Sequence, residues 1–588
     1  MRLRDTIIWS VCIVLAAALL ITAGMRLDYI NSQRQQMKLI SNEPLKNAPP
    51  SLAFATVAMG AFRGLVVDVL WIRADKLKEQ GQFFDAKQLA EWITTLQPRF
   101  ASVWEFQAWN MAYNISVAIP ATQPQERWRW VKNGYELLRD RGIPLNPKSI
   151  LLYRELARIF QHKIGGVTDD AHKYYKLQLA LAMEPLLSPA NNQTFCALAE
   201  APADWRQIIK DSDVLPLISA LKSADRTFED DDKFVGNYLS LRQNPDRFNA
   251  AAFNVIDDFR VTGAEALKKF DIFAKAYQLR KTWKLDPVLM LQLNKLYGPV
   301  DWADPNKHLP LDWRHPDSHA IYWAVKGLQT AGEKKFSAVE INTDRIVNHS
   351  LQNLFRNGKI FIYKRLPTNT TGEPQATSHE VFLRPDLRMF EPYNNSALAV
   401  IQKYKDIEER KGSFESLQIG HRNMLKNAAL SFYQAGHRRQ AQKIYNQLRK
   451  LYPLEEFKVP LVIFLKNRLM EELRDIGLNN AKEIVVMMVR ESYFRYAMHD
   501  DDEATGGEKM AQEAYDHYQS MYADENRIDL PDFKLLKYFA LYDFLNDQQY
   551  PPDLRRNLLG RIKVERPELF EQLAQQEEKL LKQSKQSK

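Results

Sequence analysis

The stretch RNMLKNAALSFYQAGHRRQAQKIYNQLRKLYP, residues 422–453, decides the fold of this chain. Its apolar residues recur every three or four positions in two blocks, and Gly436 separates the blocks. This spacing predicts two amphipathic helices joined by a tight turn. Ala428 and Ala441 stand where the two helices must touch, and Pro453 ends the second helix. We therefore expect an antiparallel helical hairpin.

A second stretch with the same spacing lies near the N-terminus, at residues 67–98. Alanines again occupy the two contact positions, Ala74 and Ala86, and Gly81 occupies the turn. Because glycine readily adopts the positive φ that ends a helix, this position predicts a short connection. We expect a second helical hairpin here.

The alternation of small and large residues at a period of thirty-four resembles the tetratricopeptide repeat. The resemblance is close over residues 412–456, looser over 67–185 and faint over 483–523. In the loose part, the units that follow the first hairpin carry insertions. Such repeats stack hairpin upon hairpin, so the resemblance implies a mostly α protein built as an α-solenoid.

Residues 186–410 do not show this period and predict an irregular, mostly helical middle domain. Within it, KIFIYK and EVFL are rich in β-branched and aromatic residues and flank a segment rich in Thr, Gly and Pro. This pattern predicts a small β-hairpin insertion near residues 359–383. The predicted folded domains are therefore an N-terminal repeat domain at 51–185, the middle domain at 186–410, a C-terminal repeat domain at 411–570 and a charged tail at 571–588.

An uncharged run, IIWSVCIVLAAALLITAGM at residues 7–25, precedes these domains. As a helix it would be about 28 Å long, close to the bilayer core of about 30 Å. Arg26 follows directly, which favours a single retained transmembrane anchor (residues 1–25) over a cleaved signal peptide. Arg2 and Arg4 are expected to hold the short N-terminus in the cytoplasm, so the rest lies outside the bacterial inner membrane. Residues 26–50 then form a linker.

A second apolar segment, Ser51–Ile72, carries Arg63 and Asp68 near its middle. Each such charge costs about 2.5–3.5 kcal/mol at the centre of a membrane span. We expect a buried helix that opens the repeat domain, with a second span as the alternative.

Composition argues against several classes of function. The 588 residues include 81 Lys and Arg mixed among 72 Asp and Glu, and we find no clustered basic stripe of the kind that binds nucleic acid. Glycines number only 22, and the motifs GxxxxGK[ST], GxGxxG and GxSxG are absent from the sequence, so no nucleotide cofactor is expected. The two cysteines, Cys12 and Cys196, predict no disulfide framework.

The densest polar and aromatic segment is DWADPNKHLPLDWRHPDSH at 301–319. His315 and His319 are four residues apart, which on a helix would place both rings on one face, where zinc binds, with His308 as a third weak candidate. Pro316, however, predicts a helix that starts after His315, and no cysteine or second histidine pair completes a ligand set. We expect a structural segment without metal. The alternative is an envelope enzyme or metal-binding protein that uses this cluster.

A further acidic segment, HDDDE at 499–503, lacks the alternating spacing and the central glycine of a calcium loop. It predicts a solvated loop between two helices.

The resemblance to tetratricopeptide repeats implies a concave groove lined by the first helix of each hairpin. It selects seven candidate partner-binding residues: Trp71, Trp109, Arg154, Arg158, Asn423, Lys426 and Tyr433. Repeats of this family that clamp a peptide carboxylate carry a lysine and an asparagine at two of these positions. Lys426 matches the lysine, but Leu430 replaces the asparagine, so a protein segment fits better than a carboxylate terminus.

Two longer segments, 68–117 and 311–328, are similar to parts of large single-pass tetratricopeptide proteins of planctomycete and verrucomicrobial bacteria. This resemblance implies a bacterial membrane protein and adds no mechanism. We expect a non-catalytic scaffold without cofactor that presents its groove to protein partners in an envelope-associated complex.

Overall fold

The computed structural model describes residues 63–241, 244–330, 337–365, 378–405, 411–435, 437–465, 467, 478–522, 530–547 and 550–586, with scattered positions between 12 and 33. The predicted anchor at 7–25, apart from those positions, and the linker at 26–50 lie outside the described residues. So does the first part of the segment 51–72. Within the part of the chain that is described, no helix is both long and apolar enough to cross a membrane.

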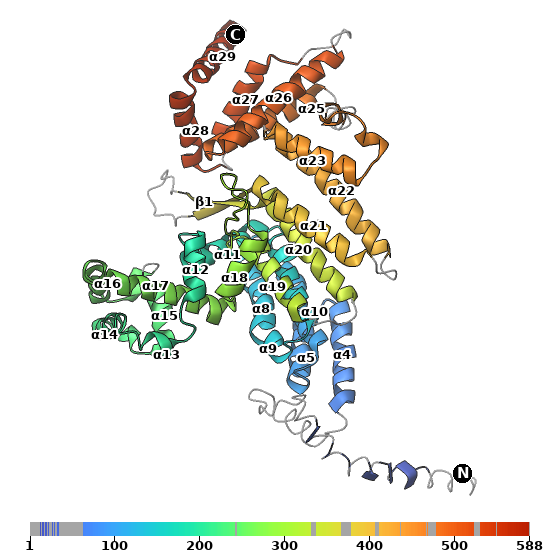
Figure 1. The fold of residues 1–588 in the computed structure, drawn as a ribbon, viewed down its shortest axis with the longest axis vertical. Helices are drawn as coiled ribbons and strands as arrows, with labels where there is room; N and C mark the ends of the chain where they lie inside the picture. Colours follow the sequence, from blue (N-terminus) through green and yellow to red (C-terminus); the bar gives the residue numbers. More distant parts are fainter. Residues whose placement is uncertain are drawn as a thin grey trace. The chain divides into compact units, whose positions relative to one another are not determined.

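The described chain is almost entirely helical and falls into two compact units, residues 1–155 and 156–588 (Figure 1). The prediction of a mostly α fold is therefore confirmed. One two-stranded sheet is the only sheet among the described residues. Both internal boundaries predicted for the repeat domains, at 185 and at 410, lie inside the second unit.

The first unit opens with the hairpin predicted at residues 67–98. Helices α4 (Arg63–Glu79) and α5 (Phe83–Leu96) pack against each other, with Ala74 and Ala86 fully buried. Gly81 lies between them with a φ of +75°, a backbone conformation that residues other than glycine rarely adopt. The small residues thus stand at the contact and the glycine at the turn, as expected.

The next helices of this unit also cross at close range. Helix α6 (Ala101–Trp109) continues through the π-helical turn η2 (Asn110–Ile115), and α8 (Pro124–Leu137) packs across both. A Cβ added at Gly134 would lie 2.9 Å from the carbonyl oxygen of Ala108. The remaining elements of this unit are α7 (Ser116–Ala118), η3 (Leu138–Gly142), α9 (Ile143–Leu145) and most of α10 (Ile150–Arg158).

The second unit begins with a group of short helices around an aromatic core, on the left of Figure 1. Phe228, Phe234, Phe270 and Phe273 are fully buried in this core. The helices that lead into, form and follow it are α11 (His172–Leu187), α12 (Asn192–Glu200), α13 (Trp205–Ile208), α14 (Leu215–Ala224), α15 (Asp231–Ser240), α16 (Ala250–Thr262), α17 (Ala264–Gln278) and α18 (Pro287–Tyr297).

The predicted β-hairpin near residues 359–383 is confirmed. Strands β1 (Lys359–Arg365) and β2 (Ser378–Arg384) pair antiparallel, with Lys359 opposite Arg384. Ile360 and Val381 are buried against Leu177 of α11, so the hairpin rests one face on a helix. It is flanked in the chain by α19 (Pro316–Thr330), α20 (Ala338–Asn357) and α21 (Phe390–Tyr404).

The hairpin that decides the fold comprises α22 (Lys411–Gln434) and α23 (Arg438–Leu451). Ala428, Ala429 and Ala441 are fully buried at the contact, whereas Gly436 lies outside the described residues. Helix α22 begins well before the expected start at residue 422. The spacing of contact residues fixes where two helices touch, but not how far the first one extends beyond the contact.

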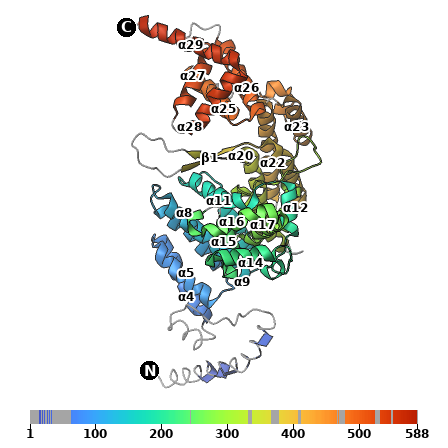
Figure 2. The ribbon, with the colours of Figure 1, turned by 90° about the vertical axis from the view of Figure 1, so that its left-hand side faces the viewer.

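The C-terminal helices gather into one bundle, seen from a second direction in Figure 2. They are α25 (Leu478–Ala497), α26 (Asp501–Tyr522), α27 (Phe533–Asn546), α28 (Pro552–Glu565) and α29 (Pro567–Gln586). Ala504, Ala511 and Ala514 line the buried side of α26, so the faint repeat at 483–523 corresponds to a further helical hairpin with alanines at its contact.

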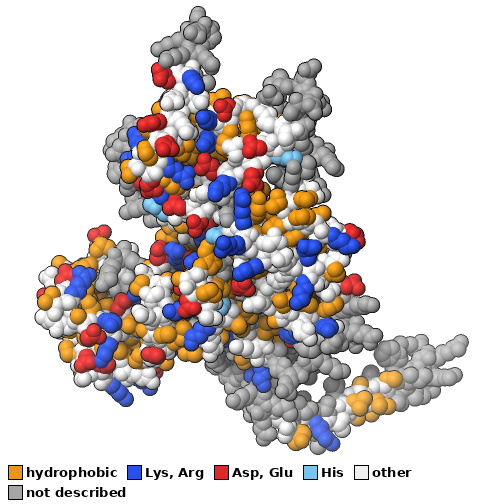
Figure 3. All heavy atoms as spheres, turned by 45° about the horizontal axis from the view of Figure 1, so that its top comes forward, with side chains coloured by type: hydrophobic (Ala, Val, Ile, Leu, Met, Phe, Trp, Pro, Cys, Tyr) orange, Lys and Arg blue, Asp and Glu red, His pale blue; other side chains and the backbone are white. Residues whose placement is uncertain are grey.

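Charges of both signs are interspersed over the face of the molecule shown in Figure 3. Hydrophobic side chains are scattered among them. On this face the surface is the mixed one that the composition predicts.

The close crossing at Gly134 yields a prediction. Gly134→Val should lower the free energy of unfolding by about 1–3 kcal/mol, because the added atoms overlap the backbone of α6. Urea unfolding followed by circular dichroism measures the change. The matched control is Gly64→Ala on α4, where an added Cβ has no neighbour within 4 Å, so stability should stay the same or rise slightly. Equal losses in both variants would contradict a tight crossing.

Candidate functional site: a methionine-lined cavity beside a buried carboxylate pair

The candidate metal-binding histidines of the segment 301–319 are engaged in structural hydrogen bonds. Each ring lies within hydrogen-bond distance of a backbone carbonyl oxygen. His308 Nδ1 lies 2.7 Å from the oxygen of Gly298, His315 Nε2 lies 3.1 Å from that of Asn357, and His319 Nε2 lies 2.9 Å from that of Trp313. A ring nitrogen that donates its hydrogen to a carbonyl is not free to bind a metal. In the described ranges, no group of three or more His, Cys, Asp or Glu side chains is arranged to hold a metal ion.

His315 caps a helix. Helix α19 begins at Pro316, as predicted, and His315 stands just before it. Its Nδ1 accepts the backbone N–H of Asp317 at 3.1 Å, so the imidazole satisfies a donor at the helix start. Burial lowers the pKa of His315 to about 4, which keeps the ring neutral.

Asp317 is a fully buried carboxyl group in the same segment. Its Oδ1 accepts a hydrogen bond from Asn353 Nδ2 of α20 at 3.1 Å, and its Oδ2 lies 3.4 Å from His315 Nδ1. Burial raises the pKa of Asp317 to about 7, and the charge of Lys176 lowers it in part. The group therefore locks α19 to α20.

The aromatic groove candidates of the first unit pack within that unit. The ring of Trp71 lies 5.9 Å from that of Phe100 and 5.1 Å from that of Phe106, measured between centroids. Trp109 stacks on Tyr113 at 6.2 Å. Both tryptophans are half-buried, so much of their surface stabilises the fold.

The charged candidate of this unit, Arg154, forms an ion pair. Its Nη2 lies 2.7 Å from Glu105 Oε1, and both side chains are partly buried. The two residues occupy equivalent positions in consecutive predicted repeats, on α10 and α6. The pair therefore links α6 and α10 through their side chains.

The candidates of the second unit differ in their availability. Arg158 is half-buried and Asn423 is exposed. Lys426 Nζ lies 3.3 Å from Glu456 Oε2, and Tyr433 Oη donates to Glu513 Oε2 at 3.4 Å. A partner that uses the latter two groups has to exchange these intrachain contacts for its own. Within the second unit, the histidine candidates lie before α19 or in its first turn, whereas the groove candidates lie on α10 and α22.

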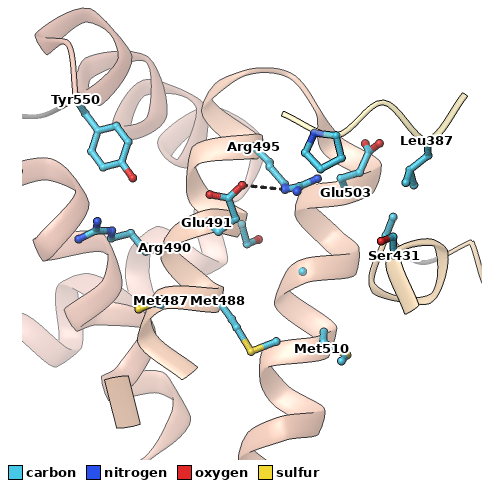
Figure 4. Close-up of a pocket in the computed structure, with 14 residues that line it drawn as sticks. Leu387, Ser431, Met487, Met488, Arg490, Glu491, Arg495, Glu503, Met510 and Tyr550 are labelled. Atoms are coloured by element: carbon cyan, nitrogen blue, oxygen red, sulfur yellow. Dashed lines mark ion pairs between the residues drawn. The ribbon is translucent and has the colours of Figure 1, made fainter. Parts of the chain in front are cut away.

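A cavity of about 500 Å³ lies between α22, α25 and α26 (Figure 4). Met487, Met488 and Met510 lie toward one end of it, at the bottom of Figure 4, and Tyr550 lies at the upper left. Met487 is 64% exposed, so an apolar side chain stands at the rim in contact with solvent. Methionine is flexible and polarisable and adapts to irregular apolar surfaces. This end of the cavity is suited to an apolar side chain from outside.

The charged groups that line the cavity are already paired. Arg495 Nε lies 3.3 Å from Glu491 Oε1, the dashed contact of Figure 4, and Arg384 Nε lies 3.1 Å from the same oxygen. Arg490 Nη2 lies 3.5 Å from Asp547 Oδ2. The charges thus hold the walls in place.

One lining residue, Glu503, belongs to a buried carboxylate pair. Lys359 Nζ, at the start of β1, lies 2.9 Å from Asp500 Oδ1 and 3.4 Å from Glu503 Oε1, and the two acids hydrogen-bond each other. Burial, and then Asp500, raise the pKa of Glu503 to about 7. Burial opposes ionisation of Asp500 too, but the hydrogen bond with Glu503 and the charge of Lys359 lower its pKa. The pair therefore shares one proton near neutral pH.

The prediction that residues 499–503 form a solvated loop is therefore wrong for these two acids. Asp500 and Glu503 are largely buried because Lys359, far away in the sequence, supplies their counter-charge. Asp501 also forms an ion pair, since its Oδ1 lies 3.1 Å from Arg561 Nη1.

Sequence reasoning missed the cavity as well. The only signal is the pair Met487-Met488 on α25, and apolar residues of a helix usually belong to a core. In comparisons with known proteins, no family model and no curated protein matches this chain.

His319 provides a test of the structural role of the 301–319 segment. Its ring stacks on Phe160 at 4.9 Å and is fully buried. His319→Ala should therefore lower the free energy of unfolding by about 2–4 kcal/mol, and elemental analysis should find the same zinc content in variant and wild type. The control His162→Ala removes an exposed ring and should cost less than about 0.5 kcal/mol. Stoichiometric zinc that disappears in the first variant would establish a metal site instead.

The carboxylate pair predicts a pH dependence. The folded protein keeps a proton on Glu503 that the unfolded chain releases near its ordinary pKa of 4.5, so stability should fall as pH rises from about 4.5 to about 7. Glu503→Gln keeps the neutral form at every pH. It should leave stability unchanged near pH 4 and raise it by about 1–3 kcal/mol at pH 8.

Urea unfolding over pH 4–8 measures this difference. The control Glu568→Gln, which removes an exposed carboxylate on α29, should follow the wild-type profile. A profile of Glu503→Gln parallel to that of the wild type would show that no proton is shared.

Proposed function

We propose that this chain is a membrane-anchored, non-catalytic scaffold that binds a protein partner in an envelope-associated complex. The apolar run at residues 7–25 supplies the anchor, and the helical hairpins form a solenoid related to tetratricopeptide repeats. The region after the anchor lies outside the inner membrane. The partner is held without chemical reaction.

Hairpins with small residues at their contacts support the solenoid. They recur at α4–α5, α22–α23 and α25–α26, each with buried alanines. In the first unit, the ion pair between Arg154 and Glu105 joins consecutive first helices. Proteins built from such hairpins commonly bind other proteins through extended surfaces.

The observation that carries partner binding is the methionine-lined cavity. An amphipathic helix of a partner could insert one long apolar side chain beside Met488 and Met510, and cover the exposed Met487 at the rim. Flexible methionines form such adaptable contacts with helices. The polar lining groups are satisfied within the chain, so burying them beneath a partner helix costs little.

The test is crosslinking of the full chain in native membranes, followed by identification of the crosslinked proteins. The chain should remain in the membrane fraction after an alkaline wash, and a specific partner should be recovered with it. Met487→Lys places a charge in the rim, and recovery of the same partner should fall at least about fivefold. The fold should be unaffected because the residue is exposed.

Val564→Lys is the matched control. It also replaces an exposed apolar residue by lysine, on α28 and outside the lining of the cavity, and should leave recovery unchanged. Equal recovery with both variants would contradict the cavity as the docking site. The absence of any specific partner would contradict the scaffold itself.

A further inference from the structure

Helix α23 departs from the mixed surface of the protein. Its sequence, RRQAQKIYNQLRKL, contains no carboxylate and five cations: Arg438, Arg439, Lys443, Arg449 and Lys450. Its opposite face is buried through Ala441, Ile444, Tyr445 and Leu448, so these cations are directed away from the hairpin core.

Four of these cations make no ion pair with any described residue: Arg439, Lys443, Arg449 and Lys450. The acidic side chains nearby are already engaged by other cations: Glu455 with Lys458, Glu456 with Lys426 and Glu513 with Arg438. The face thus carries an uncompensated positive charge.

Three of the unpaired cations lie along one line. Arg439, Lys443, Asn446 and Lys450 recur at the spacing that places residues on the same side of a helix, and all four are exposed. From the first to the last, the line is about 16 Å long. A row of this length matches a short segment of a partner better than a single small ion.

A hollow of about 430 Å³ adjoins the C-terminal end of this line. Lys450 and Lys458 lie at it together with Arg449, and the exposed Leu454 supplies apolar surface. Among the described residues, no carboxylate lines it. Phe457 is only 1% exposed, so it does not present an open ring on which a nucleic-acid base could stack.

We propose that α23 and this hollow bind an acidic peptide segment of a partner protein, with one apolar side chain of that segment in the hollow. The carboxylates lie along Arg439, Lys443 and Lys450. This proposal extends the scaffold function to a second surface and names the chemistry of its partner. It does not involve the methionine-lined cavity, so the two can fail separately.

The probe is a fluorescein-labelled peptide, EEDFEE, titrated with the full chain in non-ionic detergent and followed by fluorescence anisotropy. Binding should weaken as salt rises from 0.05 M to 0.3 M, because exposed charges are screened. The double variant Arg439→Gln, Lys450→Gln should weaken binding at least about tenfold at low salt. The peptide EEDSEE, which lacks the apolar side chain, should bind more weakly than EEDFEE.

The matched control is the double variant Lys210→Gln, Lys534→Gln. It removes two exposed lysines, one in the turn after α13 and one on α27, and should leave binding unchanged. Both double variants should keep the wild-type circular dichroism and melting temperature. Met487→Lys should also bind the peptide normally.

Three results would overturn the proposal. One is equal affinity of wild type and the α23 variant for EEDFEE. Another is tighter binding of a single-stranded oligonucleotide of equal charge, which would make the face a nucleic-acid surface. The third is preferential binding to vesicles that contain phosphatidylglycerol, lost in the α23 variant, which would make it a lipid surface.

Discussion

The close approach of helices at small side chains is the constraint on which each hairpin of this protein depends. Between α6 and α8, Gly134 brings two backbones nearly into contact, and α22 and α23 bury alanines where they meet. Where the helices touch this closely, the larger apolar residues on either side, such as Tyr445 and Leu448, interlock and exclude water. The small residues thus stabilise the fold indirectly, because they let neighbouring large side chains bury their apolar surface.

Buried charge is the second organising feature, and it joins segments that are distant in sequence. Lys359 of β1 reaches Asp500 and Glu503 of the C-terminal bundle, and within that bundle Arg561 reaches Asp501. Placing a charge in a protein interior is costly unless an opposite charge meets it with good geometry. Each of these pairs therefore specifies one arrangement of its two segments rather than adding much to stability.

Local patterns in the sequence predicted local structure well. Alternating β-branched residues gave the hairpin near 359–383, and Pro316 gave the start of α19. Features that need two distant segments were not predictable. The acidic run at 499–503 resembles a solvated loop until Lys359 is placed beside it, and the cavity exists only once α22, α25 and α26 are assembled.

The basic face of α23 was missed for a different reason. The net charge of the whole chain conceals this helix, in which most cations lack an ion-pair partner. The acidic residues that balance the total charge lie elsewhere in the chain. Only the contacts of each nearby carboxylate show that the balance fails locally. A charge count made helix by helix would have flagged this segment.

The pairing of Lys359 with Asp500 also sets an order of events during synthesis. The two residues are 141 positions apart, so the β-hairpin leaves the ribosome long before its counter-ions exist. Until α26 has been made and has packed on α25, the lysine at the base of the hairpin stays hydrated. The edge of the sheet and the C-terminal bundle can therefore reach their final packing only together, after most of the chain has been translated.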